Sequence, residues 1–172
     1  APHKANQDSY VVCENMLGDP NCHVFGVFDG HGEMGDYCSH FAADRFPHYL
    51  EDELKNNGGT NTLLGEYMPI IYKKAMTRTN RAMHKHHEVD DILSGTTAIT
   101  VIVKDDKLFV GNVGDSRAII GSENSKGQLI ASALSNDQTP YRKDERERLK
   151  LEGAVIMTMD QIEGLEPVHE NW

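Results

Sequence analysis

The stretch FGVFDGHGEMGDYCSHF, residues 25–41, joins an apolar run to an acidic residue and a cluster of glycines. The apolar run ends at Asp29, and Gly30, Gly32 and Gly35 follow before a helical pattern begins. These glycines satisfy G-x-G-x-x-G, the spacing of a dinucleotide-binding turn between a strand and a helix. Whether this turn binds a nucleotide, or whether Asp29 gives it another purpose, decides the fold.

The first half of the chain reads as a hairpin followed by two helices. Runs rich in β-branched and aromatic residues cover 9–14 and 22–29, with a Gly-Asp-Pro-Asn turn between them. Apolar residues then recur at steps of three and four over 37–54 and again over 62–87. Pro47 interrupts the first of these patterns, so we expect a kink or a break in that helix.

The second half reads mainly as short strands. Four are expected, over residues 96–103, 107–113, 117–121 and 128–134. A helix over 140–152 should follow, capped by Thr139 and supported by an Asp144–Arg148 pair, and then a short strand over 154–158. Because helices and strands are segregated, the pattern predicts one α+β domain over residues 1–172, with helices packed on antiparallel sheet.

Composition limits the possible partners and compartments. The formal net charge of −10 argues against nucleic acid and anionic membrane, since both bind basic patches. No apolar run approaches the roughly 18 residues that a membrane span needs. The three cysteines have no C-x-x-C spacing and favour free thiols, which fit a reducing compartment. We therefore expect a cytoplasmic protein, with the nucleus as an alternative location.

Three features argue against a dinucleotide-binding turn. The carboxylate of Asp29 would repel a pyrophosphate, although a helix N-terminus would attract one. A second helix follows the first, so that no strand returns until about residue 96 to form a strand-helix-strand unit. The close spacing of the later strands also favours antiparallel pairing rather than the parallel sheet of that fold.

A strand-terminal Asp-Gly pair has two other interpretations. It is a common turn dipeptide, but the Asp29 carboxylate and the Gly30 carbonyl are also the oxygen ligands that Mg²⁺ and Mn²⁺ prefer. Asp8 precedes the first strand and Asp115 follows the strand at 107–113. Each alone would be read as a turn or cap residue, but together they could meet at one sheet edge and hold metal ions.

Four blocks of sequence resemble the metal-dependent Ser/Thr protein phosphatases of type 2C. In the family's order they are KANQDS (4–9), FGVFDGHGE (25–33), SGTTAITVIV with LFVGNVGDSRAII (94–120) and ALSNDQTPYRKDERERLKLEGAVI (133–156). The closing MDQIEGLEPVHENW is similar to plant and protist members. The resemblance implies an antiparallel β-sandwich flanked by helices in four layers, α-β-β-α, and hydrolysis of phosphoserine and phosphothreonine in phosphorylated protein substrates.

The resemblance also implies a metal site with two or more Mg²⁺ or Mn²⁺ ions. Asp29 would bridge two ions, and the Gly30 carbonyl would bind one. Asp8 would hold metal-bound water, and Asp115 would serve an additional, weaker site. The implied nucleophile is a metal-bridging hydroxide whose pKa the cations lower.

The remaining roles fall on His31 and Lys4. His31 would be the general acid that protonates the departing Ser or Thr oxygen. Lys4 stands where many members have a phosphate-binding Arg, and Gln7 stands where many have Glu. The family's catalytic domain continues past the motifs found here and adds further Asp ligands. We therefore expect an incomplete N-terminal part of the domain, weakly active or inactive alone, which could self-associate through open sheet edges.

Two alternatives remain. The chain could be a non-catalytic, phosphatase-like binding or regulatory module, although its retention of Asp29, Gly30, His31 and Asp115 favours an enzyme. A second candidate metal site is the cluster of histidines at 84, 86 and 87. A solvated helix C-terminus explains these histidines better, because His also suits the helix dipole there.

Overall fold

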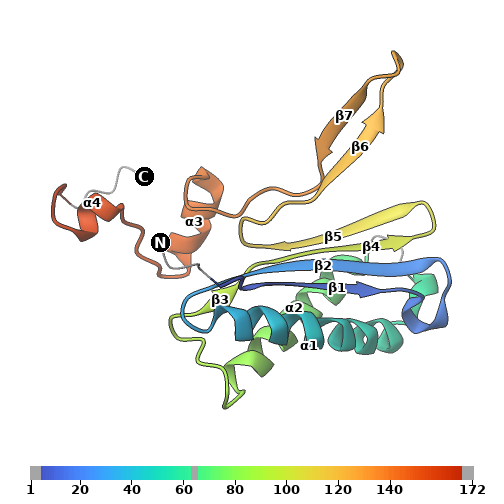
Figure 1. Ribbon diagram of the computed structural model, residues 1–172, viewed down its shortest axis with the longest axis horizontal. Helices are drawn as coiled ribbons and strands as arrows, with labels where there is room; N and C mark the ends of the chain where they lie inside the picture. Colours follow the sequence, from blue (N-terminus) through green and yellow to red (C-terminus); the bar gives the residue numbers. More distant parts are fainter. Residues whose placement is uncertain (1–4, 63–65, 168–172) are drawn as a thin grey trace. The chain divides into compact units, whose positions relative to one another are not determined.

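The computed structural model describes residues 5–62 and 66–167. The chain divides into two compact units, Ala1–Asn136 and Asp137–Trp172. The first unit contains a five-stranded antiparallel sheet and two long helices (Figure 1). Its strands are β1 (Asp8–Cys13), β2 (Cys22–His31), β3 (Gly95–Thr96), β4 (Ala98–Lys104) and β5 (Lys107–Val113).

The sheet has the order β1-β2-β4-β5, and β3 pairs with the end of β2. Every pairing is antiparallel, as the short connections predict. The dinucleotide-binding interpretation is therefore excluded on topology, because β2 and β4 flank the two helices in sequence but run antiparallel. A 3-10 turn, η1 (Met16–Gly18), connects β1 to β2.

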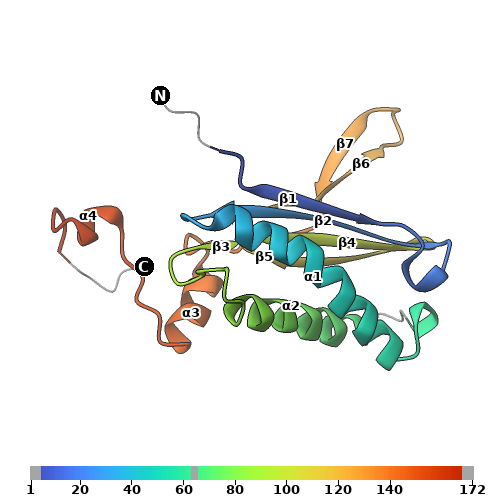
Figure 2. The same cartoon turned by 60° about the horizontal axis from the view of Figure 1, so that its bottom comes forward.

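Alternation along β2 separates a buried face from an exposed one. Cys22, Val24 and Phe28 are fully buried, whereas Phe25 and Val27 are 42% and 48% exposed. The helices α1 (Gly35–Asn56) and α2 (Met68–His84) cover the buried face (Figures 1 and 2). Their apolar stripes complete the core, which includes Phe46, Leu50, Leu54, Ile71, Tyr72 and Ala75.

The two helices differ from expectation in their bounds. Pro47 lies inside α1 without ending it, because Phe46 and Leu50 on either side are fully buried and hold the helix against the sheet. The second helix begins at Met68 rather than at residue 62, with Pro69 in its first turn, where a missing N–H costs nothing. A separate 3-10 turn, η2, covers Thr60–Thr62.

The strands β6 (Ile119–Glu123) and β7 (Leu129–Ala133) form a two-stranded antiparallel sheet of their own. Antiparallel sheets with segregated helices confirm the α+β expectation. In the described part of the first unit, one layer of helices packs on one layer of sheet around a single core, and the β6–β7 hairpin is a separate sheet.

The second unit holds α3 (Lys143–Leu151) and α4 (Met159–Ile162). Three local predictions fail there. The N-cap of α3 is Arg142, not Thr139. The expected Asp144–Arg148 pair does not form, because Arg148 binds Glu145 at 2.5 Å and Asp144 binds Arg142. Residues 154–158 form no strand, because a strand needs a neighbour to satisfy its backbone.

Among the described helices, none is long and apolar enough to cross a membrane.

Candidate functional site

Two residues of the predicted metal site, Asp8 and Asp29, lie directly opposite one another on neighbouring strands. The Gly30 N–H donates to the Gln7 carbonyl at 3.2 Å, so the next pair along, Asp8–Asp29, is of the non-hydrogen-bonded type, in which side chains lie closer. Both side chains are exposed. Strand geometry therefore places the two carboxylates side by side at one end of the sheet.

This pair suits a divalent cation. Like charges directly opposite on paired strands destabilise a sheet. Within residues 5–62 and 66–167, no hydrogen bond or ion pair involves either carboxylate. The donor set, carboxylate oxygens with room for water, is the one that Mg²⁺ and Mn²⁺ accept. A cation bound here would convert a repulsive pair into an attractive one, so Asp8 and Asp29 fit the implied metal.

Gly30 is required by the close approach of two backbone segments. A Cβ at this position would overlap the carbonyl oxygen of Gly35 and would lie 2.5 Å from that of Gln7. Glycine thus lets the first turn of α1 pack against the ends of β1 and β2, directly beside Asp29. This packing explains the first and last glycines of the G-x-G-x-x-G spacing, and Gly32 has a positive φ of 88° in the turn.

His31, the last residue of β2, lies on the same face as Asp29. Residues two apart on a strand share a face and are about 6.6 Å apart along it, and both side chains are exposed. Gly95 lies opposite His31 in β3, and a Cβ there would come within 3.0 Å of His31 Nε2. Gly95 therefore gives the imidazole its space.

A hydroxyl relay connects the Asp29 backbone to the loop that holds Asp115. The Asp29 N–H donates to Thr97 Oγ1 at 3.0 Å, and the Thr97 N–H donates to the Asp29 carbonyl at 2.9 Å. Thr97 Oγ1 lies 2.6 Å from Ser116 Oγ. The segment after β5 is thereby tied to the end of β2, which brings the third predicted Asp to this end of the sheet.

Gln7 fixes the turn between β2 and α1. Its side-chain amide donates to the Gly32 carbonyl at 2.8 Å, and its own carbonyl accepts from Ser39 Oγ at 2.6 Å. The Met34 N–H donates to Ser94 Oγ on the other side of the turn. The sequence alone predicted no structural role for Gln7, Ser94, Gly95 or Thr97. For the last three, the run of glycine and hydroxyl residues at 94–97 was the signal that could have identified them.

The described part of the chain does not by itself contain a complete metal cluster. In residues 5–62 and 66–167, no group of three or more His, Cys, Asp or Glu side chains is placed to hold an ion. Asp8 and Asp29 are paired, whereas Asp115 is connected to Asp29 indirectly, through Ser116 and Thr97. Lys4, the predicted phosphate ligand, lies outside the described residues.

The histidines after α2 have other partners. His84 Nδ1 lies 2.9 Å from a carboxylate oxygen of Asp91 and is 71% exposed. The His86 ring packs edge-on against Phe41 and stacks with His87, both at 5.2 Å between centroids. The exposure of His84 and these contacts agree with the predicted solvated helix C-terminus rather than with a metal site.

The cysteines are free thiols, as predicted. Burial raises the pKa of the Cys22 thiol to about 11 and raises the pKa of Cys38 as well. Thiolate, not thiol, is the nucleophilic form. Neither buried cysteine is therefore a candidate for nucleophilic catalysis.

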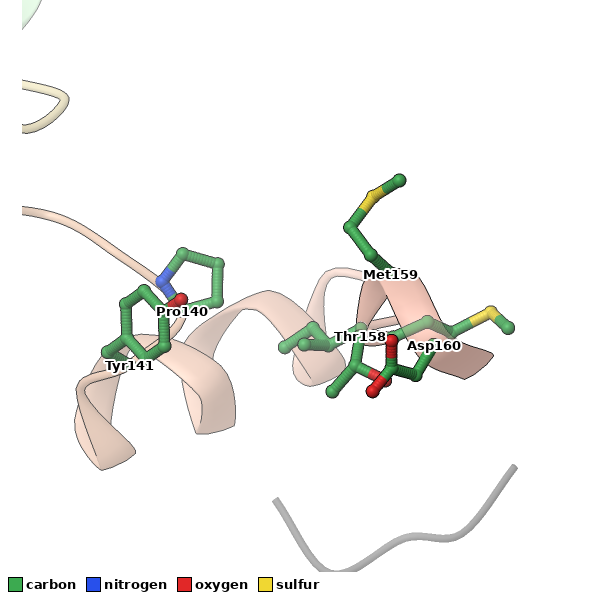
Figure 3. Close-up of a pocket in the computed structure, with 7 residues that line it drawn as sticks. Pro140, Tyr141, Thr158, Met159 and Asp160 are labelled. Carbon is green, nitrogen blue, oxygen red and sulfur yellow. The ribbon is translucent and has the colours of Figure 1, made fainter. Parts of the chain in front are cut away.

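A hollow of about 420 Å³ lies in the second unit, and its lining includes none of the predicted site residues. Pro140 and Tyr141 line one side of it, and the segment from Thr158 to Asp160 lines the other (Figure 3). The hollow offers one carboxylate and no basic side chain in its lining, so it does not resemble a phosphate site.

Comparison with known proteins places this geometry in a family. The family model of protein phosphatase 2C matches residues 3–165. Probable protein phosphatase 2C 35 of Arabidopsis thaliana is 46% identical over the whole chain, which covers 47% of that protein. Probable protein phosphatase 2C 64 of Oryza sativa subsp. japonica is 34% identical over 92% of the chain, covering 37% of that protein.

A solved structure agrees with the sequence relatives. The crystal structure of serine-threonine phosphatase 2C from Toxoplasma gondii superposes with a TM-score of 0.65 at 25% identity, covering 88% of this chain and 51% of that one. The chain thus spans between 37% and 51% of the length of these three relatives. On the family match, the shared sequence and the shared fold, the chain belongs to the protein phosphatase 2C family.

Proposed function

We propose that this chain provides part of the active site of a Mg²⁺- or Mn²⁺-dependent phosphatase that hydrolyses phosphoserine and phosphothreonine in proteins. The observation that carries the proposal is the Asp8–Asp29 pair. These two exposed carboxylates lie opposite one another and form no ion pair with a basic side chain in the described residues. Family membership supports the reaction class, and free thiols in the described chain fit the cytoplasm or the nucleus.

Asp29 and the Gly30 carbonyl would hold the ions, Asp8 would hold metal-bound water, and Asp115 would serve a further, weaker site. Bound divalent cations would lower the pKa of a water molecule toward neutrality and neutralise charge on the phosphate. On a chain with a net charge of −10, such ions would also supply the positive field that an anionic substrate requires. Lys4 remains a candidate for direct phosphate contact.

His31 is proposed as the general acid. It is exposed, shares a face with Asp29 and has space beside Gly95. The unperturbed pKa of His lies near 6.5, so an imidazolium can donate its proton at neutral pH to the departing Ser or Thr oxygen. We expect the 172 residues alone to bind metal weakly and turn over slowly, because residues 5–62 and 66–167 bring only two carboxylates of the predicted site together.

One observation favours a different function. The described residues contain no cluster of three metal ligands. A non-catalytic, phosphatase-like binding module would not need such a cluster, so its absence favours that module. The two functions differ in whether the Asp8–Asp29 pair binds metal at all, and metal binding can be measured without turnover.

The first test measures Mn²⁺ binding to the chain by isothermal titration calorimetry. Asp29→Asn removes one of two paired charges and should weaken binding by about tenfold or more, which corresponds to about 1.4 kcal/mol. Asp106→Asn, at an exposed turn position, is the matched control and should leave the affinity unchanged. Equal affinities of the Asp29 variant and the parent chain would refute the ligand assignment.

The second test measures turnover of a phosphothreonine peptide by a chimera in which this chain replaces the matching segment of the Arabidopsis relative. In the chimera, His31→Ala should lower kcat by about a hundredfold, the usual contribution of a general acid, and should leave Mn²⁺ affinity intact. A parent chimera that neither binds Mn²⁺ nor turns over the peptide would support the binding module instead.

A further inference from the structure

Helix α2 carries charge of the opposite sign to the rest of the chain. Residues 68–84 contain four Lys or Arg residues and no Asp or Glu. The rest of the chain holds 13 basic and 27 acidic residues, which gives it a formal net charge of −14. A cationic helix on an acidic protein marks a local surface that attracts negative charge.

The cations of α2 line a hollow on the surface. The hollow measures about 480 Å³ and extends from Pro69 and Ile70 past Lys73 and Thr77 to Arg81. It lies on the side of α2 opposite its buried stripe, which contains Ile71, Tyr72, Ala75 and Met83. Ile70 is 53% exposed and adds an apolar contact at one end. Figures 1 and 2 show α2 in green.

The inner cations of this surface already have partners. The Arg78 guanidinium donates to Asp52 and to Glu53, each at 2.9 Å, and lies 4.6 Å over the Tyr49 ring. Lys74 Nζ lies 3.8 Å from a Glu53 oxygen. These contacts fix α2 to α1 and form a rigid wall of the hollow, so they contribute shape rather than available charge.

The outer cations have no such partners. Lys73 and Arg81 are exposed, and neither makes an ion pair with any residue in the described ranges. They are eight residues apart on the helix, which is about 12 Å along its axis. An extended peptide covers this distance in about four residues, so two acidic side chains four positions apart would reach both cations.

We propose that this face of α2 is a docking surface for an acidic peptide segment of a partner protein. Carboxylates of the segment would contact Lys73 and Arg81, and an apolar side chain two residues before the first carboxylate, on the same face of the extended peptide, would pack on Ile70 and Pro69. The proposal goes beyond the phosphatase reaction, since the surface involves none of Asp8, Asp29, Gly30 and His31.

The test measures fluorescence anisotropy of a labelled peptide containing Leu-Ser-Glu-Ser-Ser-Ser-Glu, titrated with the chain at roughly physiological ionic strength. The double variant Lys73→Glu/Arg81→Glu should weaken binding by about tenfold or more, or about 1.4 kcal/mol. Lys107→Glu/Lys126→Glu changes the net charge by the same amount at exposed positions elsewhere and should change the affinity less than about twofold.

A peptide with Gln in place of both Glu residues should bind at least about tenfold more weakly than the acidic peptide. Saturable binding with these three differences supports the surface. Equal losses in the two double variants would show that only overall charge matters, and absence of saturable binding, or equal binding of the neutral peptide, would also overturn the proposal. Because no step depends on turnover, a failure here is distinct from a failure of the phosphatase assignment.

Discussion

Gly30 is the residue whose identity the local packing restricts most. A Cβ there would overlap the Gly35 carbonyl, which belongs to helix backbone and cannot move aside. We predict that Gly30→Ala lowers the free energy of unfolding by about 3 kcal/mol, at the upper end for overpacking. In Gly121→Ala the new Cβ meets only Leu129 Cδ1 at 3.6 Å, so this control should stay within about 0.5 kcal/mol. Urea unfolding of both variants measures the difference, and equal values would contradict the packing argument.

Gln7 uses its side chain as a donor, which a carboxylate cannot do. Its amide donates to the Gly32 carbonyl at 2.8 Å, so Gln7→Glu would set an anionic oxygen against that carbonyl. We predict a loss of about 1–3 kcal/mol in the free energy of unfolding, measured by urea titration in a chelating buffer.

Gln128 provides the matched control for this substitution. There the side-chain oxygen accepts from Asn124 Nδ2 at 3.1 Å, and a carboxylate keeps that role. Gln128→Glu should therefore leave the stability nearly unchanged. If both Glu variants unfold at the same urea concentration, the donor role of Gln7 is wrong.

These residues show how far sequence reasoning reaches at a site. Asp29 and Gly30 could be singled out because an apolar strand, an acidic stop and a glycine turn are adjacent in the sequence. Thr97 could not, because its bond to Asp29 joins residues 68 positions apart. Gln7 and Gly32 are 25 positions apart, and only the β1–β2 register brings them together.

Among the elements, the pattern of apolar residues predicted the first-unit strands, but it did not predict where the helices end, and the strand expected over 154–158 is absent. The bounds of the first-unit strands agree with expectation to within two residues, because the apolar pattern fixes which face is buried. The exception is the strand expected over 96–103, which the structure divides into β3 and β4. Pro47 indicated a break, but burial of Phe46 and Leu50 outweighs the lost hydrogen bond. The apolar residues at 154–158 suggested a strand, yet sequence alone cannot supply the partner that pairing requires.

Asp19 connects three elements at the end of the sheet away from the site. Thr60 of η2 donates to its carboxylate at 2.5 Å, and the Asn21 N–H donates at 2.9 Å. Lys104, at the end of β4, lies 3.3 Å away. The Thr60 hydroxyl above all, then the Asn21 N–H and Lys104, hold the pKa of Asp19 below its ordinary value of 3.8.

A lowered pKa makes the contribution of Asp19 depend on pH in one direction. The ionised form is favoured in the folded state, so its stabilisation is present above the unfolded pKa and is lost as pH falls through the folded one. Asp19→Asn should therefore unfold at lower urea than the parent at about pH 7, and the gap should close below about pH 4. Asp106→Asn, an exposed turn variant, should match the parent at neutral pH. A gap that stays constant down to about pH 2 would contradict this linkage.

At the scale of the whole molecule, the first unit leaves apolar surface on the sheet face away from α1 and α2. Its exposed side chains include Tyr10, Val12, Phe25, Val27 and Leu108. The strands β1 and β5 end the order of the sheet, so each has one edge without a partner strand among the described residues. Unpaired edges beside exposed apolar side chains are where chains associate.

We therefore predict that the chain self-associates as its concentration rises, measured by sedimentation velocity. Val12→Lys places a charge on the edge strand β1 at a side chain that is already 53% exposed, so it should weaken association by about tenfold without unfolding the sheet. Ile92→Lys makes the same change of charge at a position that is 81% exposed and lies before β3. This control should associate like the parent, because Ile92 lies on no strand edge. A parent chain that stays monomeric at every concentration, or two variants that weaken association equally, would show that the open sheet does not drive it.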